Sequence, residues 1–197
     1  MRTYLPILVI ASSLCLQSCA TGPPPYRKTA DIPSSDALKQ MVVFRHDPYE
    51  NSYKIETPWL RDENYSRRGQ LLLRTWTAGR ELETGHELYR TKNMNVQIFL
   101  SFQFNDWQFL DRAYAWGGGK LKTSIISRDV IRCGEFGCLL SEDIAINLKL
   151  KEIETIVLVG RGFKFKVSGN SSDIPIFLEH KVLKGFLDAL KENTKEV

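Results

Sequence analysis

The sequence has few of the residues that build metal and redox centres. Its 197 residues include four cysteines and three histidines, and none of His46, His86 and His180 has a second histidine or a cysteine at metal-ligand spacing. No HExxH, GxSxG or SxxK motif occurs, and the GGGK segment at 117–120 lacks the flanking residues of a phosphate-binding loop. These absences predict a protein with no metal, no cofactor and no enzymatic activity.

Long apolar runs and blocks of like charge are also missing. After the N-terminus, no apolar stretch approaches the length of about 20 residues that a membrane-spanning helix needs. The net charge is only +4, and acidic and basic residues are interspersed, which excludes a nucleic-acid-binding arm. No repeat of about 20–50 residues is visible, which argues against propellers and solenoids.

The first 18 residues have the pattern of an export signal. Arg2 is followed by an apolar run at 5–16 that is broken only by Pro6 and two serines. This run is too short to span a bilayer, and a basic start with a short apolar middle is typical of a signal peptide. We therefore expect residues 1–18 to be removed.

The segment Leu16-Gln17-Ser18-Cys19 resembles the lipobox of bacterial lipoproteins. In that family the cysteine receives a diacylglycerol, the signal is cut before it, and the new amino terminus is usually acylated, commonly with palmitate. The resemblance implies that Cys19 is lipidated, and two or more acyl chains hold a protein stably at a membrane. Because Ala20 follows and not aspartate, the family's sorting rule implies the outer membrane, facing the periplasm. In a host with one membrane, the same cysteine implies display at the cell surface.

The composition of residues 19–35 indicates a tether. They hold four prolines and almost no large apolar side chains, and proline-rich segments favour an extended polyproline conformation. The remaining residues, 36–197, have the length of one domain. An apolar content of 43% and an aromatic content of 11% predict a packed core there.

Two cysteines lie close together in the folded part. Cys133 and Cys138 are separated by four residues, two of them glycines, and are expected to form a disulfide across a hairpin loop in an oxidising compartment. Pairing residues 124–133 with 138–147 places Arg128 opposite Asp143. The same register places Asp129 opposite Glu142, which is unfavourable unless a bulge intervenes.

Strict alternation of apolar and polar residues predicts mostly strands. The pattern is clearest at 95–104, where Phe99 is the one exception, and it recurs at 143–151 and 162–167. Weaker strand candidates, separated by turn signals, are 41–46, 52–57, 70–77, 86–91, 109–116, 121–132 and 154–159.

The C-terminus has a helical pattern over 177–192. Val182, Leu183, Phe186, Leu187 and Leu190 fall on one stripe, with Asp173 and Pro175 as start signals. Gly185 is costly inside a helix, and we expect a strand or an aromatic ring to press close there. The predicted fold is mainly β with this C-terminal helix: an antiparallel β-sandwich or a partly open barrel, with the helix packed on or capping the sheet.

One stretch is unusually rich in aromatic residues. Trp107, Phe109, Tyr114 and Trp116 precede three glycines, and we favour their packing in the core. The alternative is a ligand site, formed by Trp107, Tyr114 and Trp116, in which the aromatic rings stack on a glycan or grip a peptide.

The sequence is compatible with three functions. The favoured one is a non-catalytic lipoprotein that binds a protein or another component of the cell envelope through its sheet surface. The second is a lipid or small-ligand carrier with a cavity inside the barrel. The third and weakest is a cell-wall hydrolase that uses two carboxylates in a cleft, drawn from Asp62, Glu63, Asp106, Asp111, Glu142 and Asp143.

Overall fold

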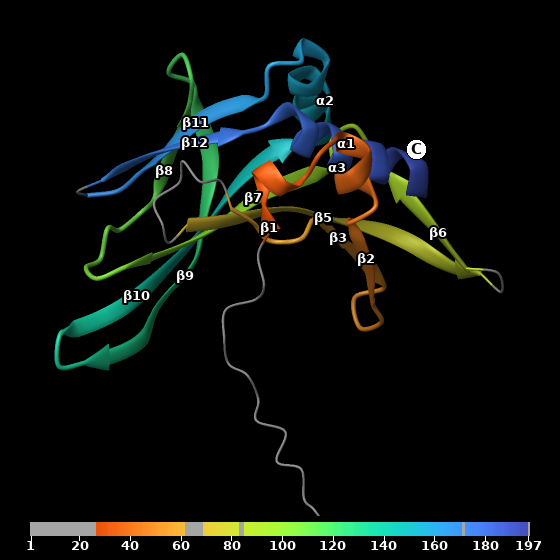
Figure 1. Ribbon diagram of the computed structural model, residues 1–197. Helices are drawn as coiled ribbons and strands as arrows, with labels where there is room; N and C mark the ends of the chain where they lie inside the picture. Colours follow the sequence, from red (N-terminus) through yellow and green to blue (C-terminus); the bar gives the residue numbers. More distant parts are fainter. Residues whose placement is uncertain (1–26, 62–68, 83–84, 171, 197) are drawn as a thin grey trace, which may run out of the picture.

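A computed structural model describes residues 27–61, 69–82, 85–170 and 172–196, in which a curved sheet carries three helices (Figure 1). The strands are β1 (Arg27–Lys28), β2 (Val43–Asp47), β3 (Ser52–Glu56), β4 (Leu60–Arg61), β5 (Gly69–Leu82), β6 (Gly85–Arg90), β7 (Asn95–Phe104), β8 (Arg112–Ala115), β9 (Lys120–Gly134), β10 (Gly137–Lys149), β11 (Phe163–Ser168), β12 (Asp173–Leu178) and β13 (Thr194–Glu196). The helices are α1 (Ser35–Lys39), α2 (Leu150–Val159) and α3 (His180–Asn193), with a 3-10 turn η1 (Thr29–Asp31) before α1.

The sheet is a mainly antiparallel half-barrel. Its strands follow the order β1-β4-β5-β7-β10-β9-β8-β11-β12, and β2, β3, β6 and β13 attach beside this path. Within the described residues, only the β1–β4 and β6–β13 pairs are parallel. Of the two predicted architectures, the partly open barrel is therefore confirmed.

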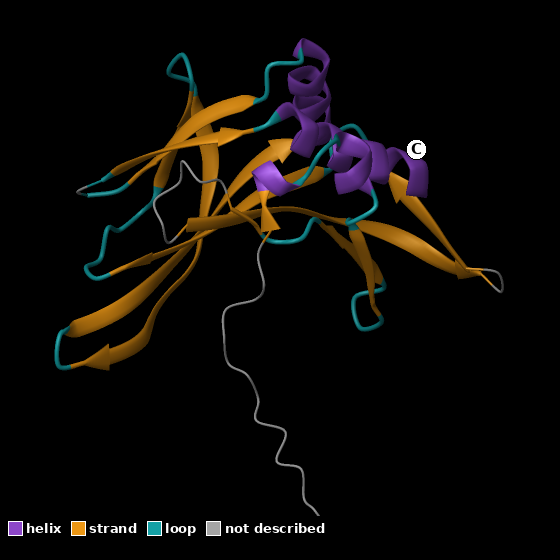
Figure 2. Cartoon of the chain, viewed as in Figure 1, coloured by secondary structure: helices purple, strands orange, loops and turns teal. Residues whose placement is uncertain are grey.

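The helices lie on one side of the sheet, as Figure 2 shows. Alternate residues of β5, β7 and β10 point to that side and pack with α3 in one buried cluster. The predicted apolar stripe of α3 is buried in this cluster, and Leu183, Phe186 and Leu190 are completely inaccessible to solvent. None of the helices in the described part of the chain is long and apolar enough to cross a membrane.

The exception in the alternation of β7 has a structural cause. Phe99 points to the outer face, where it forms a small second cluster with Leu72 and Ala145. The indole of Trp59 makes an edge contact with the Phe99 ring at 5.5 Å between ring centroids, and the Arg74 guanidinium lies 4.1 Å above that ring. Burial among these groups lowers the pKa of Arg74 from its ordinary value.

The β9–β10 hairpin has the predicted disulfide but a different register. Cys133 and Cys138 are bonded and lie opposite each other. A register shift between Leu139 and Leu140 then pairs Arg128 with Glu142, so the predicted Arg128–Asp143 pair is wrong. The bulge removes the unfavourable pairing of two acids, because Asp129 faces Ser141.

The segment 154–159 is helical, and the strand prediction for it was wrong. The strand β10 ends at Lys149, whose backbone N–H is accepted by the Glu152 carboxylate at 2.5 Å in a capping box. Leu150 and Ile153 are buried on one side of α2, whereas Leu158 is 87% exposed. The run of four apolar residues at 156–159 concealed the helical spacing of Leu150 and Ile153.

The C-terminal helix begins later than predicted. Residues 173–178 form β12, in which Ile174, Ile176 and Leu178 alternate into the core. Pro175 fits there because β12 is the last strand in the sheet order, and a proline is tolerated on an edge strand. The helix therefore starts at His180, and residues 177–179 are not part of it.

Gly185 allows α1 to approach α3. A Cβ atom at this position would lie 2.5 Å from the Ser35 carbonyl oxygen and 2.9 Å from the Leu38 Cβ. The close neighbour is therefore a helix, and not the strand or ring that the sequence suggested.

The folded domain includes part of the predicted tether. Thr29 and Ile32 are buried, and Ser34 caps α1 by accepting the backbone N–H of Ala37. The signal peptide at 1–18 and the lipobox with Cys19 lie outside the described residues.

Candidate functional site

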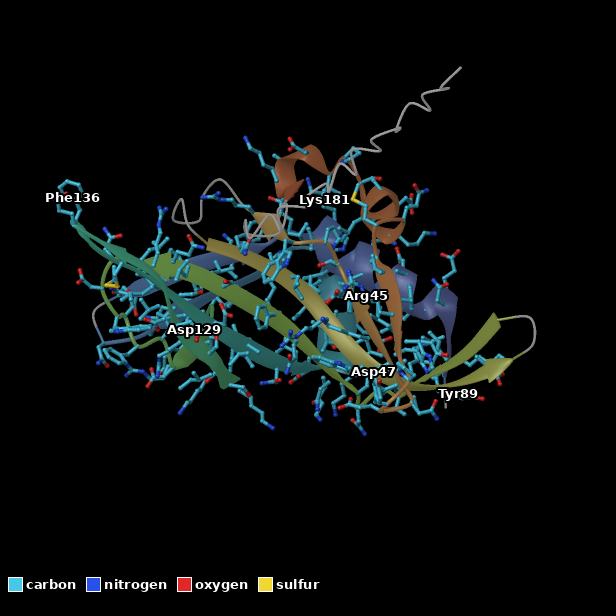
Figure 3. All side chains as sticks on the ribbon, turned by 90° about the horizontal axis from the view of Figure 1, so that it is seen from below. Arg45, Asp47, Tyr89, Asp129, Phe136 and Lys181 are labelled. Carbon is cyan, nitrogen blue, oxygen red and sulfur yellow. A yellow bond between two sulfur atoms is a disulfide. The ribbon has the colours of Figure 1, made fainter. Side chains whose placement is uncertain are left out.

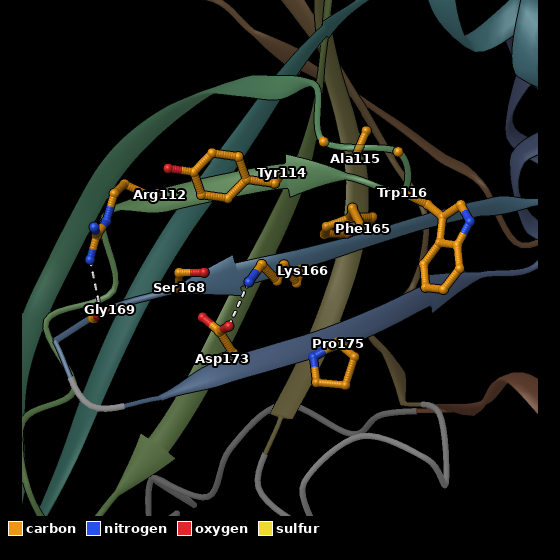
Figure 4. A pocket seen from close by; sticks show the side chains of 12 residues that line it. Arg112, Tyr114, Ala115, Trp116, Phe165, Lys166, Ser168, Gly169, Asp173 and Pro175 are labelled. Carbon is orange, nitrogen blue, oxygen red and sulfur yellow. Dashed lines mark hydrogen bonds and ion pairs between the residues drawn. The ribbon is translucent and has the colours of Figure 1, made fainter.

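A groove of about 740 Å³ lies on the outer face of β8, β11 and β12 (Figure 4). This volume is within the range of about 300–1,000 Å³ that is typical of small-molecule sites. Strand alternation builds the groove, because Ala113 and Val167 point into the core while their neighbours point outward. The pairing of the three strands places the outward side chains in rows across the sheet: Arg112 beside Ser168 and Asp173, and Tyr114 beside Lys166 and Pro175.

Two of the three candidate ligand-binding aromatics line this groove. Tyr114 is half-buried on β8, and Trp116, which follows β8, is 84% exposed. Trp107 does not line it, and its ring lies 6.3 Å from that of Phe109 in the preceding loop. The expectation that these four aromatics fill the core was wrong, because the core residues of this stretch are Leu110 and Ala113.

The three glycines after Trp116 form the turn into β9. Gly117 and Gly118 have φ angles of 100° and 96°, which side chains with a Cβ rarely adopt. The Ala115 carbonyl accepts the Gly118 N–H at 2.9 Å, and the Gly119 carbonyl accepts the Ala115 N–H at 2.7 Å. The turn leaves the Trp116 ring open to solvent at one end of the groove.

The groove contains ion-paired charges. The Lys166 Nζ lies 2.5 Å from the Asp173 carboxylate, and this ammonium, with a smaller contribution from the Ser168 hydroxyl, lowers the pKa of Asp173. Arg112 donates to the Asp111 carboxylate and to the Gly169 carbonyl, each at 2.9 Å. Both cations are thereby held in fixed positions along the groove.

The Ser168 hydroxyl is a buried polar group in this groove. Ser168 is 6% exposed, and its Oγ makes no hydrogen bond of ordinary geometry to any described residue, although it adjoins Asp173. Incomplete hydrogen bonding of a buried hydroxyl is unfavourable, so such a group favours a ligand or water that completes it.

Glu142 holds the loop that precedes β8 and contacts β11, two of the strands that form the groove. This side chain is almost completely buried, and its carboxylate accepts the backbone N–H groups of Gln108, Phe109 and Leu110 at 2.6, 3.0 and 2.7 Å. The guanidinium of Arg128 lies 3.6 Å away. The same loop contacts β11, because the Asp111 N–H donates to the Ser168 carbonyl and the Asn170 N–H donates to the Gln108 carbonyl.

The other carboxylates that we considered for hydrolysis are engaged or lie elsewhere. Asp143 accepts hydrogen bonds from Ser127 and Ser141, and Asp111 binds Arg112. Asp106 is exposed in the loop after β7, and Asp62 and Glu63 lie outside the described residues. Within the described residues, no group of three or more His, Cys, Asp or Glu side chains is placed to hold a metal ion.

A second exposed surface lies on the β9–β10 hairpin, which extends away from the body of the protein. Phe136 at its tip is fully exposed and points outward beside the disulfide (Figure 3). Further apolar side chains of β9 are about half exposed: Ile125, Ile126, Val130 and Ile131.

Sequence patterns missed β12, one of the three strands that form the groove. The alternation of Lys164 and Lys166 predicted a strand, but Asp173 and Pro175 were interpreted as start signals of the helix at 177–192, so no strand was predicted beside it. The alternation of Ile174, Ile176 and Leu178 was the available signal.

Comparison of the chain with protein-family models, curated proteins and solved structures finds no match. The functional assignment therefore depends on the geometry of the half-barrel and its groove.

Proposed function

We propose that this chain is a non-catalytic binding protein of the bacterial cell envelope, anchored by lipid on Cys19 to the outer membrane and facing the periplasm. Its binding site is the groove across β8, β11 and β12. The observation that carries this proposal is the Trp116 side chain, which is 84% exposed in a protein whose interior is otherwise packed with apolar side chains. Large exposed aromatic surfaces are commonly sites of interaction.

The packing of α3 argues against a lipid carrier. A carrier of that kind would place its ligand on the concave side of the half-barrel, between sheet and helix. That space is occupied by fully buried side chains of the sheet and of α3, such as Ile98, Phe102 and Phe186. The groove, in contrast, is open on the outer face.

The membrane anchor is tested by Cys19→Ser. We expect this variant to move from the membrane fraction to the soluble periplasmic fraction while its circular dichroism and thermal unfolding stay unchanged. A variant that stays with the membrane would contradict lipidation at this residue.

The binding function is tested by photo-crosslinking in intact cells. A benzoylphenylalanine at position 116 is expected to give a defined crosslinked product that mass spectrometry can identify. The matched control places the same probe at Tyr49, which is 97% exposed in the turn between β2 and β3. Identical products at both positions, or none at position 116, would contradict binding at the groove.

A further inference from the structure

The groove presents two aromatic side chains at the end of β8. Tyr114 lies on β8 and Trp116 in the turn directly after it, and both line the groove. The exposed indole of Trp116 and the half-buried ring of Tyr114 offer apolar faces to a ligand. A ligand with flat, ring-shaped C–H surfaces packs on such faces without requiring a deep pocket.

The polar groups beside the rings suit a ligand that carries hydroxyl groups. Asp173 offers a carboxylate that accepts hydrogen bonds, and Ser168 offers a buried hydroxyl beside that carboxylate. Ligand hydroxyls satisfy both, because they donate and accept. A phosphodiester group has no hydrogen-bond donor for Asp173, so it does not match this side of the groove.

The charge of the groove favours one acidic group on the ligand. Arg112 and Lys166 each have a carboxylate partner, Asp111 and Asp173 respectively. Lys164 has no ion pair in the part of the chain that the structure describes, and its Nζ lies 5.7 Å from the ring centroid of Trp116 and 5.5 Å from that of Phe177. One positive charge without a carboxylate partner among the described residues therefore lies beside the exposed ring of Trp116.

From these contacts we infer that the groove binds a saccharide that bears a carboxylate. The sugar ring stacks on Trp116 and Tyr114, its hydroxyls bind Asp173 and Ser168, and its carboxylate pairs with Lys164. This inference rests on the proposed function, since it names the ligand class of the same groove.

Titration of the mature lipidated protein in detergent tests the inference, with backbone amide NMR shifts as the readout. Three probes separate the chemistry: N-acetylmuramic acid, its neutral counterpart N-acetylglucosamine, and the dipeptide Ala-Glu, which has carboxylates but no sugar ring. We expect N-acetylmuramic acid to bind most tightly and to shift the amides of β8, β11 and β12.

Two variants assign the contributions. Lys164→Met keeps the apolar stem and removes the charge, and it is expected to weaken N-acetylmuramic acid about tenfold, to the affinity of N-acetylglucosamine. Trp116→Ala is expected to weaken both sugars equally, and its exposure makes misfolding no concern. The matched control is Lys151→Met, at an exposed lysine on α2, which should change neither affinity.

Several results overturn the inference. Equal binding of both sugars, with no effect of Lys164→Met, would show a neutral saccharide as the ligand. Tighter binding of Ala-Glu would show a peptide site. If no probe binds while crosslinking at position 116 still yields a defined product, the ligand class is wrong and the binding function stands. If crosslinking also fails, both are wrong.

Discussion

Replacing Glu142 by alanine tests how the groove is supported. The buried carboxylate accepts three backbone N–H groups and lies beside the guanidinium of Arg128, 3.6 Å away. Two of these N–H groups belong to Gln108 and Phe109, residues that are not buried, so we expect water to replace the carboxylate there. The N–H of Leu110 is in the core, where we expect no such replacement, so the free energy of unfolding should fall by about 1–3 kcal/mol from this group alone.

The unpaired guanidinium adds to this loss. Removing one partner of a buried ion pair costs about 3–5 kcal/mol, and Arg128 is less buried than Glu142, with 28% of its side chain exposed against 2%. We therefore expect Glu142→Ala to reduce the free energy of unfolding by about 3–5 kcal/mol in total. Glu142→Gln keeps one acceptor oxygen and should lose about 1–3 kcal/mol.

Equilibrium unfolding in urea, followed by tryptophan fluorescence, measures both variants. Glu135→Ala is the control, because Glu135 is exposed at the tip of the β9–β10 hairpin. A loss below about 1 kcal/mol for Glu142→Ala, with an unchanged m-value, would refute the supporting role of the carboxylate. A fully stable variant would instead favour Glu142 as one of the two carboxylates of a hydrolase.

Three further predictions concern single contacts. Gly185→Ala should lower Tm despite the better helix propensity of alanine, because the new methyl group overpacks the contact with α1 by about 1–3 kcal/mol; an unchanged or higher Tm contradicts this contact. Reducing the Cys133–Cys138 bond should cost no more than about 2–3 kcal/mol, since the closed loop is short, and thiol counting with and without reductant should find two additional thiols. The pKa of Asp173 is lowered by Lys166, so their pairing stabilises the fold above the ordinary carboxyl pKa of about 3.9 and is lost as pH falls through the lowered value. In Lys166→Met, an NMR titration should find this pKa raised toward its ordinary value, and an unchanged midpoint would show that the pair does not form in solution.

Local patterns identified most strands because each buries one face. The alternation at 95–104 became β7, and the predicted pairing around Cys133 and Cys138 became the β9–β10 hairpin. The predictions failed where two patterns overlap in a short segment. Apolar runs at 154–159 fit a strand or a helix, and the apolar residues of β12 join the helical stripe of α3 without a break.

The outward positions could not be assigned from the sequence. Trp116 and Tyr114 have the residue types of a core, and only the register with β11 and β12 places them in a groove with Lys166 and Asp173. Glu142 looked like a catalytic candidate because a carboxylate in the sequence does not reveal its hydrogen-bond donors. Those donors are backbone N–H groups more than thirty residues away, as the separations of 32–34 positions show.

The sequence by itself determined that the folded part is rich in strands, that it has an amphipathic helix near its C-terminal end, and that Cys133 lies opposite Cys138, since each depends on neighbours in the chain. The tertiary structure decided that the sheet curves into a half-barrel around α3 and that a bulge pairs Arg128 with Glu142. It also brought residues of three strands, from Arg112 to Pro175, into one groove. Such arrangements depend on register and on long-range packing, which no local pattern contains.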